Sequence, residues 1–132
     1  SEVDMIEIKL GHLRNPTFIK TCQKIMNTTG LTPKVAYHAM RVCTLLDQEI
    51  KQADVAFDKL KKEWVEQKED GSIDVPNEKM EGWSKAFEEF HDVKVTIDKH
   101  KFKLADLTPA ALTPADYMML EPMIADLELV NT

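Results

Sequence analysis

The stretch PKVAYHAMRVCTLLDQEIKQADVAFDKLKKEWVEQ, residues 33–67, decides the architecture of this chain. Its apolar residues recur every seven positions in two interleaved series. The members are Ala36, Cys43, Ile50, Phe57 and Trp64 in one series, and Ala39, Leu46, Ala53 and Leu60 in the other. A globular helix rarely keeps strict heptads over such a length, so the spacing predicts one long helix with a coiled-coil-like seam.

The two halves of this helix differ in what flanks the seam. Before residue 50 there is a second apolar set, which predicts burial on two sides. Its members are Val35, Met40, Val42 and Leu45. After residue 50 the flanks are charged, as in DKLKKEWVEQKED. This half is therefore expected to project from the body of the protein and to pack along one narrow seam.

A second helix is expected to return along the first. The segment EDGSIDVPN contains a glycine and a proline that interrupt helices, and Asn77 is expected to cap a helix that runs to about His91. The apolar stripe of this helix is Met80, Trp83, Phe87 and Phe90. The pattern predicts an antiparallel helical hairpin over about residues 50–92. Gly82 is a mild weakness in the second helix, of about 1 kcal/mol relative to alanine.

Two segments show the period of two that is typical of strands. MIEIKL, residues 5–10, alternates apolar and charged side chains and ends at Gly11. VKVTIDKHKFKLADL, residues 93–107, alternates as well, but its apolar phase changes within residues 98–101, which indicates a bulge or a tight turn. The two segments are expected to pair in a small sheet that lies on the helices, because such a sheet is marginal alone.

The phrase LTP occurs three times, in LTPKV, LTPAA and LTPAD. Threonine can cap a helix and proline suits its first turn, so the phrase predicts three helix starts. In the last one, Thr113 and Asp116 have the spacing of a capping box, and Pro122 is expected to kink or end the helix. The dipeptide Asn15-Pro16 predicts another short helix in the same way.

Together these patterns predict a single domain of class α+β, mainly α. It should contain the antiparallel helical hairpin, a small two- to three-stranded sheet and short flanking helices. Residues 5–50 and 93–125 would form the body, and residues 126–132 a tail.

Composition limits the partners. The net charge of -6 disfavours non-specific binding to nucleic acids. Residues 1–45 hold six basic and three acidic side chains, whereas residues 104–132 hold five acidic and no basic ones. This asymmetry is a hint of self-association. No apolar run suits a membrane span or a leader peptide, so a cytoplasmic protein is expected, with Cys22 and Cys43 as free buried thiols in a reducing compartment.

The sequence lacks the common signatures of an enzyme. None of its three serines lies in a nucleophile elbow, and no two of its four glycines are close enough for a phosphate-binding loop. We expect no catalytic activity, no cofactor and no metal. A small metal-dependent enzyme with ligands at His91 and His100, near Asp92 and Asp98, stays as an alternative.

The first alternative to the leading hypothesis is a nucleic-acid-binding accessory factor, ahead of the metal-dependent enzyme. Its basic surface would consist of Lys59, Lys61 and Lys62 together with the run Lys99–Lys103. Nearby glutamates and aspartates offset these charges, so nucleic acid is not the expected partner.

The leading hypothesis is a protein–protein contact, because two helices rarely cover a heptad seam that carries so many aromatic side chains. A homodimer would turn two hairpins into a four-helix bundle. The short C-terminal helix is also expected to leave apolar surface for a partner. The predicted interface consists of Ile50, Phe57, Leu60, Trp64, Met80, Trp83, Phe87, Phe90, Tyr117 and Met119.

The order of these segments and the phrase LTPADYMMLEP resemble a family of small proteins encoded by tailed bacteriophages. The matching residues are Leu112, Thr113, Pro114, Ala115, Asp116, Leu120, Glu121 and Pro122. The chain departs from the family in the extension before Met5 and in the KHK segment. The resemblance implies that a phage encodes the protein and that it is located in the cytoplasm of the host cell. It does not imply a mechanism. It leads to the hypothesis that the protein assists phage assembly or modulates a host protein, through an unidentified phage or host partner.

Overall fold

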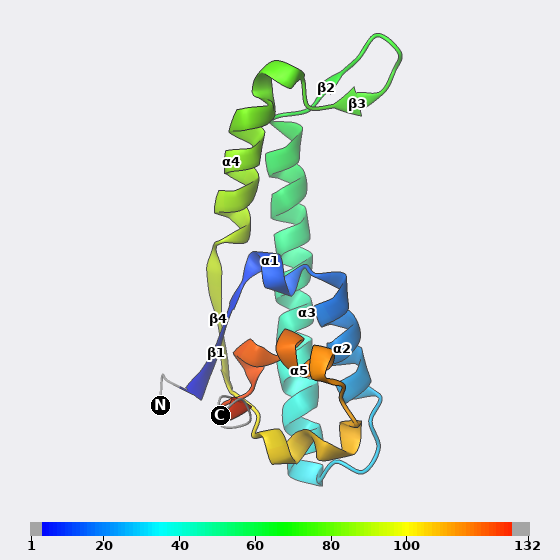
Figure 1. Cartoon of the computed structure of the whole chain (residues 1–132), viewed down its shortest axis with the longest axis vertical. Helices are drawn as coiled ribbons and strands as arrows, with labels where there is room; N and C mark the ends of the chain where they lie inside the picture. The colour runs from blue at the N-terminus through cyan, green and yellow to red at the C-terminus, as the bar shows by residue number, and fades with distance from the viewer. Residues whose placement is uncertain (1–3, 128–132) are drawn as a thin grey trace.

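The long helix α3 (Pro33–Lys62) is the axis of the molecule in a computed structural model, which describes residues 4–127 (Figure 1). Strands β1 (Met5–Lys9) and β4 (Lys94–His100) lie with helices α1 (Leu10–Leu13), α2 (Pro16–Met26) and α5 (Pro114–Met119) along its first half. Helix α4 (Met80–His91) lies beside its second half. The predicted class, α+β and mainly α, is confirmed.

Helix α3 begins where the first LTP phrase predicts. The Thr32 hydroxyl accepts a hydrogen bond from the Val35 amide, and Pro33 occupies the first turn. The predicted end at Gln67 is wrong, because the helix stops at Lys62. Glu66 and Gln67 instead form strand β2 (Glu66–Gln67), which pairs with β3 (Ile73–Asp74) in a small hairpin. Gly71 closes this hairpin at a φ of 86°, a backbone conformation that suits glycine.

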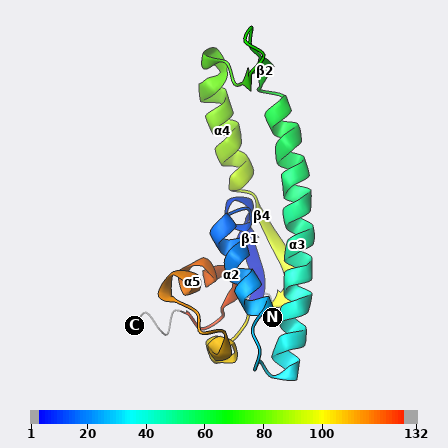
Figure 2. The ribbon, with the colours of Figure 1, turned by 90° about the vertical axis from the view of Figure 1, so that its right-hand side faces the viewer.

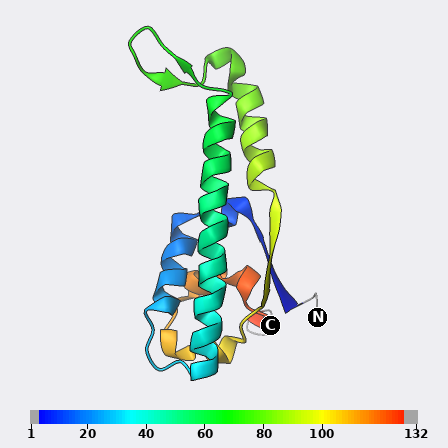
Figure 3. The ribbon, with the colours of Figure 1, turned by 180° about the vertical axis from the view of Figure 1, so that it is seen from behind.

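All other elements lie on one side of α3, as the view turned by 90° shows (Figure 2). The seam residues Ala39, Leu46 and Ala53 are buried there together with Val42. From behind, the opposite face of α3 is uncovered along its length (Figure 3). The predicted burial on two sides is therefore wrong for Met40, which is 46% exposed.

The predicted pairing of the two strands is confirmed. Strands β1 and β4 are antiparallel, with Ile6 opposite Ile97 and Lys9 opposite Lys94. The register then shifts, so that Met5 lies opposite His100. This irregularity falls within the predicted residues 98–101. It changes the phase of the chain, so that both Ile97 and Phe102 are buried.

Helix α1 is a single turn that the sequence patterns do not predict. Gly11 was expected to end the strand and instead lies inside this turn. The amide of Leu10 still donates to the Val93 carbonyl at 2.9 Å, so the chain leaves the sheet without losing contact with it. A Cβ atom at position 11 would lie 3.1 Å from Cβ of His91. Gly11 therefore permits the close approach of α1 to the end of α4.

The second LTP phrase does not start a helix, contrary to its prediction. It lies inside the 3-10 helix η3 (Leu104–Ala110), where the Thr108 hydroxyl donates backward to the Ala105 carbonyl at 2.9 Å. The third phrase behaves as predicted. Thr113 and Asp116 form a capping box at the start of α5, which ends before Pro122. Pro122 lies in the short 3-10 helix η4 (Glu121–Met123).

Two further boundaries differ from the predictions, and one agrees. Asn77 does not cap α4, because a 3-10 turn, η2 (Asn77–Lys79), precedes the helix and no side chain caps it. Asn15 caps α2 as predicted, with its side chain accepting from the Thr17 amide. Within the predicted tail, Leu127 is buried and Asp126 accepts a hydrogen bond from the backbone. The other five tail residues lie outside the described part of the chain.

Candidate protein–protein interface

An aromatic cluster joins α3 to α4. Phe57 of α3 is its centre, with its ring centroid 5.8 Å from that of Trp83, 5.7 Å from Phe87 and 5.5 Å from Phe90. These separations lie in the range in which aromatic pairs attract each other beyond simple burial. The 3-4-3 spacing on α4 brings its three aromatic side chains onto the face that looks toward Phe57. The sequence thus predicts the cluster correctly.

The outer end of the hairpin is closed by Trp64 and Gly82. Trp64 follows the end of α3 and lies with its ring centroid 6.5 Å from that of Trp83. A Cβ atom on Gly82 would be 2.7 Å from both Cη2 and Cζ3 of the Trp64 indole. The glycine, interpreted from the sequence as a weak point of the helix, is therefore the surface on which the indole rests.

Arg14, which the sequence patterns did not single out, connects the body to the base of the hairpin. Its Nε donates to Asp54 Oδ1 at 2.8 Å, and its Nη1 lies 2.7 Å from Nε2 of His91. The guanidinium carbon is 4.1 Å from the centroid of Phe57. Because arginine only donates, Nε2 of His91 is the acceptor, and Nδ1–H donates to the Phe87 carbonyl at 2.8 Å. His91 thereby links Arg14 to the backbone of α4 at Phe87.

Helix α4 is incompletely covered. It carries the whole aromatic stripe, yet none of its residues is buried. Met80 is 44% exposed and Phe87 is 41% exposed, although both belong to the stripe. The remaining hairpin residues of the predicted interface are half-buried, and these are Phe57, Leu60, Trp64, Trp83 and Phe90. An apolar face with this much accessible surface is a candidate contact surface for a protein.

The other predicted interface residues are part of the body. Ile50 is half-buried between α2 and α3 and packs against the core. Tyr117 and Met119 of α5 also pack against the core, and Phe90 does so at the base of the hairpin. On α5 it is Met118 that faces outward, with 75% of its surface exposed. The structure therefore brings the hairpin residues together and places those of α5 apart from them.

A buried carboxylate fixes α5 on α2. Asp116 Oδ2 accepts from Lys24 Nζ at 2.8 Å and from the Thr113 amide at 3.0 Å, and the Thr21 hydroxyl lies 3.1 Å from Oδ1. The hydrogen bond from Lys24, with those from Thr113 and Thr21, lowers the pKa of Asp116 to about 2. The capping box was predicted from the sequence, but the contacts with α2 were not.

The two groups of basic residues do not form one surface. Lys59, Lys61 and Lys62 lie in the last turn of α3, at the hairpin end of the molecule. The run Lys99–Lys103 lies where β4 ends, toward the opposite end (Figure 1). Within that run the side chains of Lys99 and Lys101 are half-buried.

The two histidines of the metal hypothesis are also separated. His91 ends α4 beside Gly11, whereas His100 pairs with Met5 at the far end of β4. Among residues 4–127, no three His, Cys, Asp or Glu side chains come together closely enough to hold a metal ion. None of the helices in the same part of the chain combines the length and apolar content needed to cross a membrane.

Comparisons with protein-family models, with curated proteins and with solved structures gave no match to the chain.

Proposed function

We propose that this protein is a non-enzymatic interaction protein that self-associates through its helical hairpin. The observation that carries the proposal is the state of α4, an amphipathic helix with a complete aromatic stripe and no buried residue. A stripe of this kind normally faces a core. The body covers only the base of the hairpin, so a second polypeptide is needed to cover the remainder.

A second copy of the chain is the occupant that fits best. Two hairpins packed face to face make a four-helix bundle, in which Met80 and Phe87 of each copy become core residues. The charges beside the stripe also suit such a pair. Helix α4 carries three glutamates and one lysine, whereas the last turn of α3 carries three lysines. Two copies can therefore place opposite charges beside each other.

In the cell, the dimer would assist assembly or modulate another protein. The support for this part is the resemblance of the LTPADYMMLEP segment to proteins of tailed bacteriophages. The partner would then be a phage or host protein. It would dock on apolar surface that the dimer leaves open, such as the exposed side chain of Met118.

The dimer is tested by light scattering and sedimentation equilibrium on the purified chain. One chain has a mass of 15.1 kDa, so a dimer has twice that, about 30 kDa. Phe87→Asp should shift the mass to that of the monomer, because a charge would be buried in the interface. Val55→Asp is the matched control, since Val55 is 58% exposed and lies on α3 away from the seam. A wild-type chain that stays monomeric at about 100 μM, well above the range of stable dimers, would refute the proposal.

A further inference from the structure

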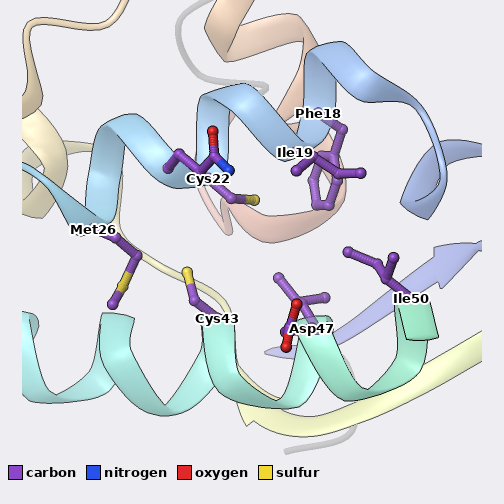
Figure 4. Close-up of a pocket in the computed structure, with 9 residues that line it drawn as sticks. Phe18, Ile19, Cys22, Met26, Cys43, Asp47 and Ile50 are labelled. Carbon is purple, nitrogen blue, oxygen red and sulfur yellow. The ribbon is translucent and has the colours of Figure 1, made fainter. Parts of the chain in front are cut away.

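Two cysteine side chains from different helices face each other in a groove between α2 and α3 (Figure 4). Cys22 comes from α2 and Cys43 from α3, and both are free and half-buried rather than fully buried as predicted. The groove is otherwise lined mainly by apolar side chains, including Phe18, Leu46 and Ile50. Small reagents can reach the thiols, while the packing of the two helices keeps them opposite one another.

The two thiols are chemically distinct. The interaction between the two side chains raises the pKa of Cys22 and lowers the pKa of Cys43. Burial raises the pKa of Cys22 further and opposes the lowering at Cys43. Because the thiolate is the nucleophile, Cys43 is the more reactive of the two, and Cys22 is a neighbour that keeps its proton.

The helix geometry is compatible with a bond between them. Packed helices have axes about 8–10 Å apart, and Cα atoms lie about 2.3 Å from each axis. Two residues that face each other directly across such a contact have Cα atoms roughly 3.4–5.4 Å apart. A disulfide needs about 4.4–6.8 Å, so the wider part of this range allows the bond without moving the backbone.

We propose that Cys22 and Cys43 form an oxidisable thiol pair that closes an internal disulfide between α2 and α3 when the protein meets a peroxide. The Cys43 thiolate attacks one peroxide oxygen and the O–O bond breaks, which leaves a sulfenic acid on Cys43 and releases hydroxide, protonated to water. The Cys22 sulfur then attacks the Cys43 sulfur while its proton passes to the sulfenic oxygen, which leaves as a second water. One hydrogen peroxide is reduced by two electrons, and each sulfur loses one.

Intact-mass spectrometry of the dilute, fully reduced chain with one equivalent of hydrogen peroxide tests the proposal. The expected product is a monomer that has lost two hydrogen atoms, has no alkylatable thiol and gives a linked peptide containing both cysteines. Dithiothreitol should restore both thiols. A product that carries oxygen on sulfur without the link, or a disulfide between two chains, would overturn the proposal.

Two variants test the assigned roles. In Cys22→Ser the sulfenic acid of Cys43 should persist and be trapped by dimedone. In Cys43→Ser the remaining thiol should react more slowly than Cys43 does in Cys22→Ser, because burial still raises the pKa of Cys22 after its partner is removed. Equal rates for the two variants would contradict the assignment of Cys43 as the nucleophile. The mass measurement on the wild-type chain remains decisive if a variant folds poorly.

Thermal unfolding provides an independent measurement on the wild-type chain. The link closes a loop between positions 22 and 43, a difference of 21 residues. The oxidised protein should therefore have a Tm roughly 5–10 °C above that of the reduced protein. A lower Tm after oxidation would show that the bond forms only if the two helices are displaced, and would contradict the geometry argued above.

Discussion

The guanidinium group of Arg14 lies over the ring of Phe57, 4.1 Å from its centroid, while it pairs with Asp54 on the same helix. One side chain from the N-terminal part of the chain thereby contacts the middle of α3. Through His91 it also contacts the end of α4. These contacts join the body of the protein to the base of the hairpin.

Replacing Arg14 with alanine should lower the free energy of unfolding by about 2–3 kcal/mol. The change removes a partly buried ion pair, a hydrogen bond to His91 and a cation–π contact. Urea denaturation measures this loss. Arg41→Ala is the matched control, because Arg41 is exposed and its guanidinium carbon lies 5.6 Å from the Tyr37 ring centroid, so its loss should cost less than about 0.5 kcal/mol. Equal effects of the two changes would contradict the role given to Arg14.

Gly82→Ala should destabilise the protein although alanine is the better helix former by about 1 kcal/mol. The new methyl group would lie 2.7 Å from two atoms of the Trp64 indole, which would have to move away from Trp83. In a Trp64→Leu background the same change should become stabilising. Thermal unfolding of the four proteins forms a double-mutant cycle. A higher Tm for Gly82→Ala in the wild-type background would show that the indole does not rest on this glycine.

Asp116→Asn should destabilise the protein by about 2 kcal/mol at neutral pH, because the amide cannot replace the carboxylate toward Lys24. The folded pKa of Asp116 is about 2, below the ordinary value of 3.8. A depressed folded pKa means that the stabilisation is fully present above about pH 4 and is lost as the pH falls toward 2. The difference between the two proteins should shrink over that interval, as chemical denaturation at several pH values can measure. A difference that stays constant down to pH 2 would exclude the carboxylate as its cause.

The three LTP threonines should respond differently to alanine substitution. Thr32→Ala and Thr113→Ala should each cost about 1 kcal/mol, because each hydroxyl accepts a hydrogen bond from an amide in the first turn of a helix. Thr108→Ala should cost less than about 0.5 kcal/mol, since its hydroxyl only donates to the Ala105 carbonyl at an exposed site. Thermal unfolding of the three variants checks this order. A cost for Thr108 equal to the others would mean that it caps a helix after all.

What the sequence predicts well is local. The cap at Thr32 and the capping box of Thr113 with Asp116 involve residues no more than three positions apart. The heptads likewise place Phe57 and Trp83 on facing stripes, because the period of a helix fixes which side chains share a face. The register shift near the end of β4 was visible as a change in apolar phase.

The contacts that the sequence did not reveal join residues that are far apart along the chain. Arg14 meets Asp54 and His91, which lie 40 and 77 positions away in the chain, so no short pattern records the contact. The end of α3 at Lys62 was missed because Trp64 still fits the heptad series. Its indole contacts α4 from a position after the end of α3. The heptad pattern of apolar residues therefore continues past the last helical residue.

Helix α3 contains no glycine or proline between residues 34 and 62, so it provides no hinge between body and hairpin. Its 30 residues correspond to a length of about 45 Å, and this length sets the distance from the base of the protein to its tip. In a dimer formed through the hairpins, this length would determine the distance between the two bodies. An antiparallel arrangement would hold the two bodies far apart, whereas a parallel one would hold them side by side. A single distance measured between spin labels on the two copies would distinguish these shapes.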